Sequence, residues 1–219
     1  MELARAVTIE VVASTRKLEF QFDLSGGQLA LDLANTISRR DDLQRRKDHL
    51  QSYRDVVSLL CQSEVISQKQ AHELREHALR YLAEAGRSFA RIIKLREAVY
   101  RVFSAIAQRD SVDPDDLKLI NDFATEALQQ RALAPVDGGY RWLWISGAKH
   151  SFDWAVWSAA KAAADLLTSD DLQMVRFCAA PDCQWLFLDR SRNRSRRWCD
   201  MASCGNRAKA RRHYQRTHD

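Results

Sequence analysis

The chain has 219 residues and a formal net charge of +5, and hydrophobic residues make up 46% of it. This length suits one medium-sized domain followed by a small one. No apolar run is long enough to cross a membrane. Glu2 and Glu10 interrupt the first apolar stretch, which makes it a poor signal peptide. Only three prolines and seven glycines occur, which indicates a helix-rich fold.

The first part of the chain carries repeated helical patterns. A short alternating segment at 18–22 predicts a strand, and Gly26-Gly27 then turns the chain into a helix whose apolar positions extend to Ile37. Two largely apolar runs, at 132–136 and 140–145, flank the turn tripeptide Asp-Gly-Gly at 137–139, which predicts a β-hairpin. The other helices are expected at 49–61, 66–83, 88–108 and 114–130, and from Ser151 onward.

Polar residues beside these apolar stripes suggest a pocket. Asp32 and Arg96 lie on helices that should be buried, and a buried charge needs a partner, so we expect them to face each other. Asn35 would add to the polar floor, and Trp142 or Trp144 would form a wall, so that a small-molecule effector could bind. The alternatives are a structural ion pair or hydrogen-bond network without a cavity, and tryptophans that pack in the core.

Four cysteines near the C-terminus follow the pattern C-x4-C-x15-C-x4-C. Two short pairs at this separation are typical of a structural zinc site, because each pair closes a turn over half of a tetrahedron. An iron–sulfur cluster also uses four cysteines, and two disulfides in a secreted module would leave Cys61 unpaired. We expect one structural Zn²⁺, held by Cys178, Cys183, Cys199 and Cys204.

The segments between the cysteines predict a small treble-clef-like unit. Short strands are expected at 185–188 and 196–198, and a helix at 205–217 whose Ala210 and Tyr214 would pack against Trp185 or Trp198. We therefore expect a mainly α fold. Residues 1–170 would form a helical domain with a small β-hairpin, and residues 171–219 the zinc finger. Thiols committed to a metal favour a cytoplasmic location.

The C-terminal unit also holds the excess positive charge. From residue 176 onward eleven cationic residues stand against four aspartates, so that residues 1–175 carry a net charge of −2. This clustering is typical of a module that binds a polyanion. On the expected helix Lys209, Arg212 and Arg216 share one face. The candidate nucleic-acid-binding residues are Arg190, Arg192, Arg194, Arg196, Arg197, Arg207, Lys209, Arg211, Arg212 and Arg216.

Two stretches resemble known domains. The segment WLFLDRSRNRSRRW followed by CDMASCGNR, which ends at Arg207, resembles the CGNR zinc-finger family. LSGGQLALDLANT at 24–36 and LREAVY at 95–100 resemble the ABATE domain, the usual N-terminal partner of this finger. The resemblance covers nearly the whole chain after residue 20. It implies a bacterial stress-associated transcription regulator with a DNA-binding finger.

Three functions follow from these patterns. The first is a transcription regulator whose helical domain senses a ligand or forms a homodimer and whose finger binds DNA. The second is an adaptor whose basic finger grips an acidic protein, and the third is RNA binding. A solvated cationic surface, or one that docks on the acidic N-terminal domain, is the simplest alternative. No nucleotide-binding glycine pattern, serine elbow or cysteine–histidine pair occurs, so we expect no enzyme.

Overall fold

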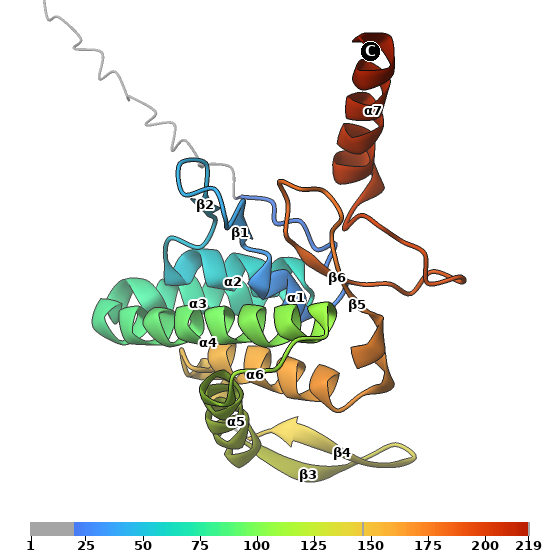
Figure 1. Cartoon of the computed structure of the whole chain (residues 1–219). Helices are drawn as coiled ribbons and strands as arrows, with labels where there is room; N and C mark the ends of the chain where they lie inside the picture. Colours follow the sequence, from blue (N-terminus) through green and yellow to red (C-terminus); the bar gives the residue numbers. More distant parts are fainter. Residues whose placement is uncertain (1–19, 146, 219) are drawn as a thin grey trace, which may run out of the picture.

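The computed structural model describes residues 20–145 and 147–218. A bundle of helices forms the body, and the C-terminal helix α7 (Asn206–His218) projects from it (Figure 1). The fold is mainly α, as the sequence predicts. The central helix α4 (Leu82–Gln108) contacts α1 (Leu29–Ala34), α2 (Tyr53–Gln62), α3 (Gln68–Arg80), α5 (Pro114–Gln129) and α6 (Trp154–Leu167).

The apolar stripe of α4 explains its central place. Ile92, Leu95, Val99 and Phe103 recur every three or four residues, so they lie on one face of the helix. Each is at most 2% exposed. Burial of one such side chain stabilises a fold by about 1.5–3 kcal/mol. The helix therefore serves as the support against which the other helices pack.

A hairpin and a capped helix follow the bundle's first half. The side chain of Asp113 accepts a hydrogen bond from the N–H of Asp115 at 2.8 Å, which starts α5 as expected. Strands β3 (Arg131–Val136) and β4 (Gly139–Trp144) then pair antiparallel and extend away from the helices (Figure 1). The short helix η1 (Ala148–His150) leads from this hairpin to α6.

The segment that follows α1 departs from expectation. The helix ends at Ala34, and Ile37 lies in β1 (Ile37–Ser38), which pairs with β2 (Lys47–Asp48). After the C-cap Asn35, the backbone pairs with a distant segment instead of continuing the helix. The carbonyl of Thr36 accepts from the N–H of His49 and Ile37 pairs with Asp48, contacts that helical periodicity does not reveal. The strand expected at 18–22 lies partly outside the described residues, and residues 20–22 are not in a strand.

The zinc-finger region begins with two strands that share the hydrophobic core of the bundle. After η2 (Asp170–Met174), strand β5 (Val175–Phe177) pairs antiparallel with β6 (Leu186–Leu188). Val175, Leu186 and Leu188 are buried in the same core as the helices. The domain boundary expected at residues 170 and 171 thus lies in η2, within a continuous core, and it stays a prediction. Across the described residues, the helices lack the length and apolar composition that a membrane span requires.

The pairing expected inside the finger is wrong. Residues 196–198 form no strand, and the segment at 186–188 pairs with β5 instead. Burial decides between the two partners, because β5 and β6 lie against α4 whereas Arg197 is exposed. A π-helical turn, η3 (Met201–Gly205), then leads into α7.

Candidate metal centre and basic helix

The four cysteines expected to bind zinc come together in space. Their Sγ atoms all lie within 4.8 Å of one another, and each residue is buried. Cys199 Sγ lies 3.6 Å from the Sγ atoms of both Cys183 and Cys204. Four sulfurs placed about 2.3 Å from one zinc ion are about 3.8 Å apart in a tetrahedron, so the cluster fits the ion. All four are free cysteines, which excludes the two disulfides.

Backbone hydrogen bonds hold the first cysteine pair against the second. The N–H of Cys178 donates to the carbonyl of Trp185 at 2.9 Å, directly after β5. The N–H of Ala179 donates to the carbonyl of Arg197 at 2.8 Å, which ties the first turn to the segment before Cys199. The first bond closes the turn that holds Cys178 and Cys183, and the second bond holds this turn beside the second pair. A bound metal ion would then join two cysteine pairs that the backbone already holds close together.

The Cys-Gly-Asn-Arg motif can be explained residue by residue. Cys204 is a metal ligand, and a Cβ on Gly205 would lie 2.8 Å from Met201 Sδ, so a larger residue there would displace the side chain of Met201. Asn206 donates from its side chain to the carbonyl of Ala202 at 3.0 Å, which closes the π-helical turn. Arg207 donates to Cys204 Sγ at 3.0 Å. A positive donor on the sulfur favours the thiolate form that zinc binds.

Asp182 gathers three arginines beside the metal centre. Its carboxylate lies 3.6 Å from Arg207, 3.9 Å from Arg211 and 3.9 Å from Arg39. Arg39 belongs to the segment between β1 and β2, whereas Arg207 and Arg211 lie on α7. Asp182 therefore links the base of α7 to the helical bundle. The charge count of the sequence shows these residues, but it does not show that they meet.

The side chain of Arg196 makes its contacts within the finger's loop and is therefore not free to bind a ligand. Its Nε donates to the carbonyl of Trp198 at 2.9 Å, and its guanidinium lies 4.6 Å from the ring centre of Phe187. The backbone N–H of Arg196 also donates to Asp189, which is fully buried. Burial raises the pKa of Asp189, but hydrogen bonds from Ser191 and Arg196 outweigh this effect and hold the pKa below its usual value.

The ten basic residues selected from the sequence therefore divide into two groups. Arg196, Arg207 and Arg211 contact the finger itself, and Arg190 lies 2.6 Å from Asp171. The other six form no ion pair within the described part of the chain and have exposed side chains. We call them the open cations: Arg192, Arg194, Arg197, Lys209, Arg212 and Arg216.

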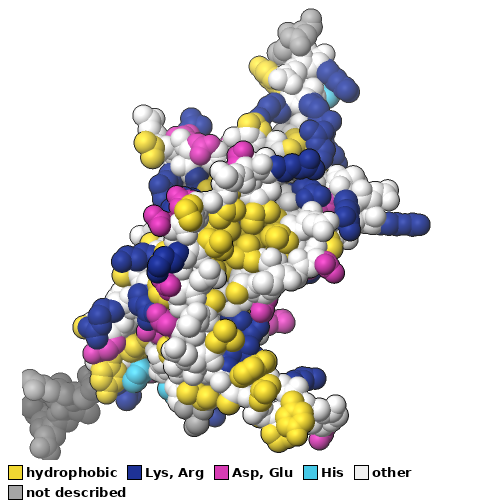
Figure 2. Space-filling model, turned by 60° about the horizontal axis from the view of Figure 1, so that its bottom comes forward, with side chains coloured by type: hydrophobic (Ala, Val, Ile, Leu, Met, Phe, Trp, Pro, Cys, Tyr) yellow, Lys and Arg dark blue, Asp and Glu magenta, His cyan; other side chains and the backbone are white. Residues whose placement is uncertain are grey.

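Helix α7 stands in solvent. From Lys209 to Thr217 every side chain is exposed, and Tyr214 is 63% exposed. The expected packing of Ala210 and Tyr214 against Trp185 or Trp198 is therefore wrong. Trp185 instead donates from Nε1 to the carbonyl of Ile37 at 2.9 Å. Lysine and arginine side chains gather along the projecting helix (Figure 2).

The finger docks on the bundle through a reciprocal pair of hydrogen bonds. The amide group of Asn35 donates to the carbonyl of Leu186 at 2.8 Å and accepts from its N–H at 2.9 Å. A third bond joins the N–H of Leu188 to the carbonyl of Gly26 at 3.0 Å. Asn35, expected in the floor of a pocket, thus pairs like a strand residue with β6.

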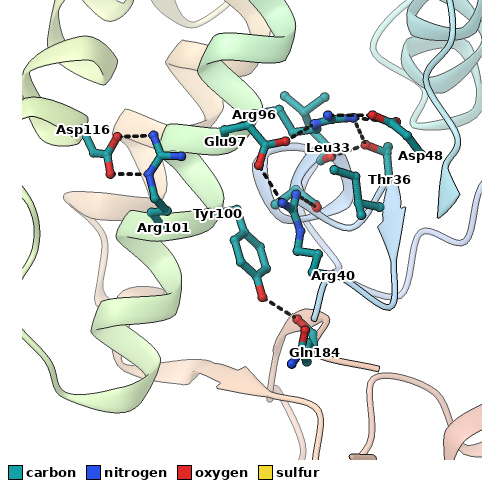
Figure 3. A network of polar contacts seen from close by, with 12 residues as sticks. Leu33, Thr36, Arg40, Asp48, Arg96, Glu97, Tyr100, Arg101, Asp116 and Gln184 are labelled. Carbon is teal, nitrogen blue, oxygen red and sulfur yellow. Dashed lines mark hydrogen bonds and ion pairs between the residues drawn. The ribbon is translucent and has the colours of Figure 1, made fainter. Parts of the chain in front are cut away.

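The expected pairing of Asp32 with Arg96 is wrong. Arg96 is 2% exposed and donates to Asp48 at 2.7 and 2.8 Å and to Glu97 at 2.8 Å. Arg40 lies 2.6 Å from the same Glu97 (Figure 3). Asp48 lies in β2, so the ion pair is a structural clamp that fastens this strand to α4.

The expected pocket wall is also misplaced. Trp144 packs edge-on against Trp154, with ring centres 6.4 Å apart, and Trp142 is 49% exposed. Both belong to the hairpin, which lies at the opposite side of the bundle from α1 (Figure 1). Asp32, Arg96 and the tryptophans therefore lie in separate places and do not surround one pocket.

Asp32 is a buried carboxylate with an unusual environment. It is 5% exposed, and its Oδ1 accepts no hydrogen bond from the described residues. Burial raises its pKa to about 7, although backbone N–H groups of Gly26 and Gly27 lower it. A Cβ on Gly26 would lie 2.7 Å from Oδ1, so the loop can approach only as glycine. Asp32 thus lies under the loop that receives β6.

Comparison with known protein families agrees with this architecture. The ABATE family model, described as "Putative stress-induced transcription regulator", matches residues 27–170, and the CGNR zinc-finger model matches residues 174–217. The chain belongs to the ABATE family. Comparison with curated proteins gives no match. The resemblance to both domains is confirmed, and the ABATE protein carries one structural zinc site in a CGNR finger.

Sequence reasoning missed several residues of this site. Asp182 and Asp189 were counted only as charges, and Arg196 was grouped with the ligand-binding cations. A signal was present for Asp189, because an aspartate two residues before a serine is typical of a turn in which its carboxylate accepts backbone hydrogen bonds. No comparable local signal marks Asp182, since its partners lie far away in the sequence.

Proposed function

We propose that this ABATE protein is a transcription regulator that binds duplex DNA through α7 and the loop at 190–197. The observation that carries the proposal is the projecting helix, whose face of Lys209, Arg212 and Arg216 is exposed. An α-helix is about 10–12 Å across with its side chains, and the major groove of DNA is about 12 Å wide. Arg192, Arg194 and Arg197 would contact phosphates beside the groove.

The bundle would fix the orientation of this helix. The zinc site and Asp182 hold the base of α7, while Asn35 and Trp185 attach the finger to the helical core. Short exposed helices are only marginally stable in water. The zinc-held turn before α7 would therefore supply a fixed start from which the helix orders on its target.

The remaining expectations belong to the same proposal. We expect no catalysis, a cytoplasmic location, and a helical domain that senses a ligand or forms a homodimer. The exposed apolar side chains of the hairpin, Leu133, Tyr140 and Trp142, form the surface to examine for a second copy. Sedimentation equilibrium of the wild type and of Trp142→Ser would measure whether such a dimer exists.

Binding of the full zinc-loaded chain to three ligands tests the proposal. Duplex DNA, structured RNA and an acidic peptide of equal net charge are each titrated over a salt series. We expect duplex DNA to bind most tightly, with log K falling against log salt at a slope of about −4 to −6, since six open cations can each neutralise a phosphate. Preference for RNA would replace the DNA proposal, and preference for the peptide would favour the adaptor.

A further inference from the structure

A cavity lies away from the zinc finger, between α2, α3 and the first turns of α4. Its volume is about 850 Å³. Sites for organic ligands commonly measure about 300–1,000 Å³. Its lining residues are Ser52, Tyr53, Arg54, Gln68, His72, Arg75, Glu76, Ala78, Leu79, Leu82, Ala85, Gly86 and Phe89.

One wall of this cavity is apolar. Leu79 is 69% exposed and Leu82 is 71% exposed, and both line the cavity together with Phe89. Ala85, at 4% exposure, forms the buried end of this wall. A ligand that covers these side chains removes their apolar surface from water, which makes the free energy of binding more favourable.

The other wall is mainly cationic. The guanidinium groups of Arg54 and Arg75 line it, together with the single carboxylate of Glu76. Arg75 donates to the hydroxyl of Ser58 at 3.0 Å, which holds its guanidinium against α2. A guanidinium matches the geometry of a carboxylate or sulfonate, which it can bind through two parallel hydrogen bonds.

Gly86 gives an independent reason to assign a ligand to this place. It lies inside the 27-residue helix α4, where glycine is less favourable than alanine. Apart from its chain neighbours and the backbone of its own helix, no described atom lies within 4 Å of the position that its Cβ would take. Protein packing therefore does not require a glycine here, and the missing side chain leaves the cavity wall open.

We propose that this cavity binds an organic anion with an apolar body. The body lies against Leu79, Leu82 and Phe89, and the charged group faces Arg54 and Arg75. A cationic ligand would meet two guanidinium groups and one carboxylate, which disfavours it. The inference rests on the sensing role proposed above and gives that role a site and a ligand class.

Two fluorescent probes with similar aromatic bodies test both halves of the inference. The probe 1-anilinonaphthalene-8-sulfonate is anionic, and N-phenyl-1-naphthylamine is its neutral counterpart. Each is titrated into the full zinc-loaded chain. We expect the anionic probe to bind at least about tenfold more tightly than the neutral one, as one charge-assisted hydrogen-bonded pair allows. Equal affinities would overturn the assignment of an anion.

Variants locate the binding site. Gly86→Leu fills the cavity and should weaken both probes about tenfold or more, whereas Arg75→Gln should weaken only the anionic probe. Leucine favours a helix more than glycine does, so the melting temperature should not fall. Gly86→Ala controls for helix stability, and Trp142→Ser controls for binding at the exposed hairpin. Unchanged affinity in Gly86→Leu, or loss in Trp142→Ser, would overturn the site.

The outcome is separable from that of the proposed function. Probe binding is measured without DNA, so a negative result removes the cavity proposal and leaves the DNA-binding proposal standing. Conversely, a chain that binds the anionic probe at Gly86 but shows no affinity for DNA retains the ligand site and loses the regulator proposal.

Discussion

At the scale of single residues, buried charges fasten the finger and the first strands to the bundle. Arg96 meets Asp48 and Glu97, and Asp189 accepts hydrogen bonds from Ser191 and Arg196. Tyr100 extends this polar face of α4 to the finger through its hydroxyl, which donates to the carbonyl of Gln184 at 3.4 Å (Figure 3). These contacts satisfy groups that would otherwise be costly to bury.

Asp32 is the buried acid that lacks such support, and it should make stability depend on pH. Its pKa is 3.8 in the unfolded reference and about 7 in the fold, so the native state binds the proton more tightly. Stability should therefore fall as pH rises from about 4 to about 7 and then level off. Each unit of pKa shift corresponds to about 1.4 kcal/mol, so the free energy of unfolding should fall by a few kcal/mol over this range.

The variant Asp32→Asn should remove most of this loss. We expect it to be more stable than the wild type at pH 8 and close to it at pH 4, because the amide stays neutral throughout. Urea unfolding of both proteins across this range measures the difference. If the stabilities of the two proteins changed in parallel with pH, the Asp32 carboxylate would not be the cause of the pH dependence.

At the scale of elements, the zinc finger has two parts with different supports. Strands β5 and β6 lie in the main core, whereas residues 190–205 depend on the metal turns and on hydrogen bonds to Asp189 and Asp200. The Ser203 hydroxyl and its backbone N–H, the latter at 2.6 Å, both donate to Asp200, and these hydrogen bonds lower the pKa of Asp200.

Removal of zinc should therefore unfold the finger only in part. After chelation, hydrogen exchange of the amides of Arg196, Ser203 and Gly205 should become fast, while the buried amides of α4 keep their protection. Exchange followed by mass spectrometry before and after chelation measures both. Cys61→Ser, which changes the one cysteine outside the cluster, serves as the control. Full protection of residues 190–205 without zinc would contradict the metal's structural role.

Sequence patterns predicted those elements that depend on local information. The stripe from Ile92 to Phe103 and the cap at Asp113 gave the correct helices, and cysteine spacing gave the metal cluster. Strand partners in the finger could not be inferred, because three-residue strands pair according to which segment lies against α4. The partner of Arg96 could not be predicted from the sequence either, since Asp48 is 48 residues away and lies in a two-residue strand.

At the scale of the whole molecule, charge is separated along the chain. Residues 1–175 have a net charge of −2, and the cationic excess lies in the finger and on α7. An acidic bundle would repel a polyanion and leave the projecting helix as the favoured point of contact. The ABATE body would then act as a rigid support, and the CGNR finger as the contact surface.

One measurement tests this account most directly: the salt dependence of DNA binding by two charge-matched triple variants. The first carries Lys209→Ala, Arg212→Ala and Arg216→Ala on α7. The second carries Arg45→Ala, Arg87→Ala and Lys118→Ala, whose side chains on the bundle are 71%, 69% and 71% exposed. Both lose three positive charges, so any difference between them reports where DNA lies.

We predict that the α7 variant loses most of its affinity and that the slope of log K against log salt becomes less steep by about 3. The bundle variant should keep the wild-type slope, because none of its three cations belongs to α7 or to the loop at 190–197. Equal losses in the two variants would show that net charge alone governs binding. An unchanged slope in the α7 variant would contradict the central claim that this helix contacts DNA.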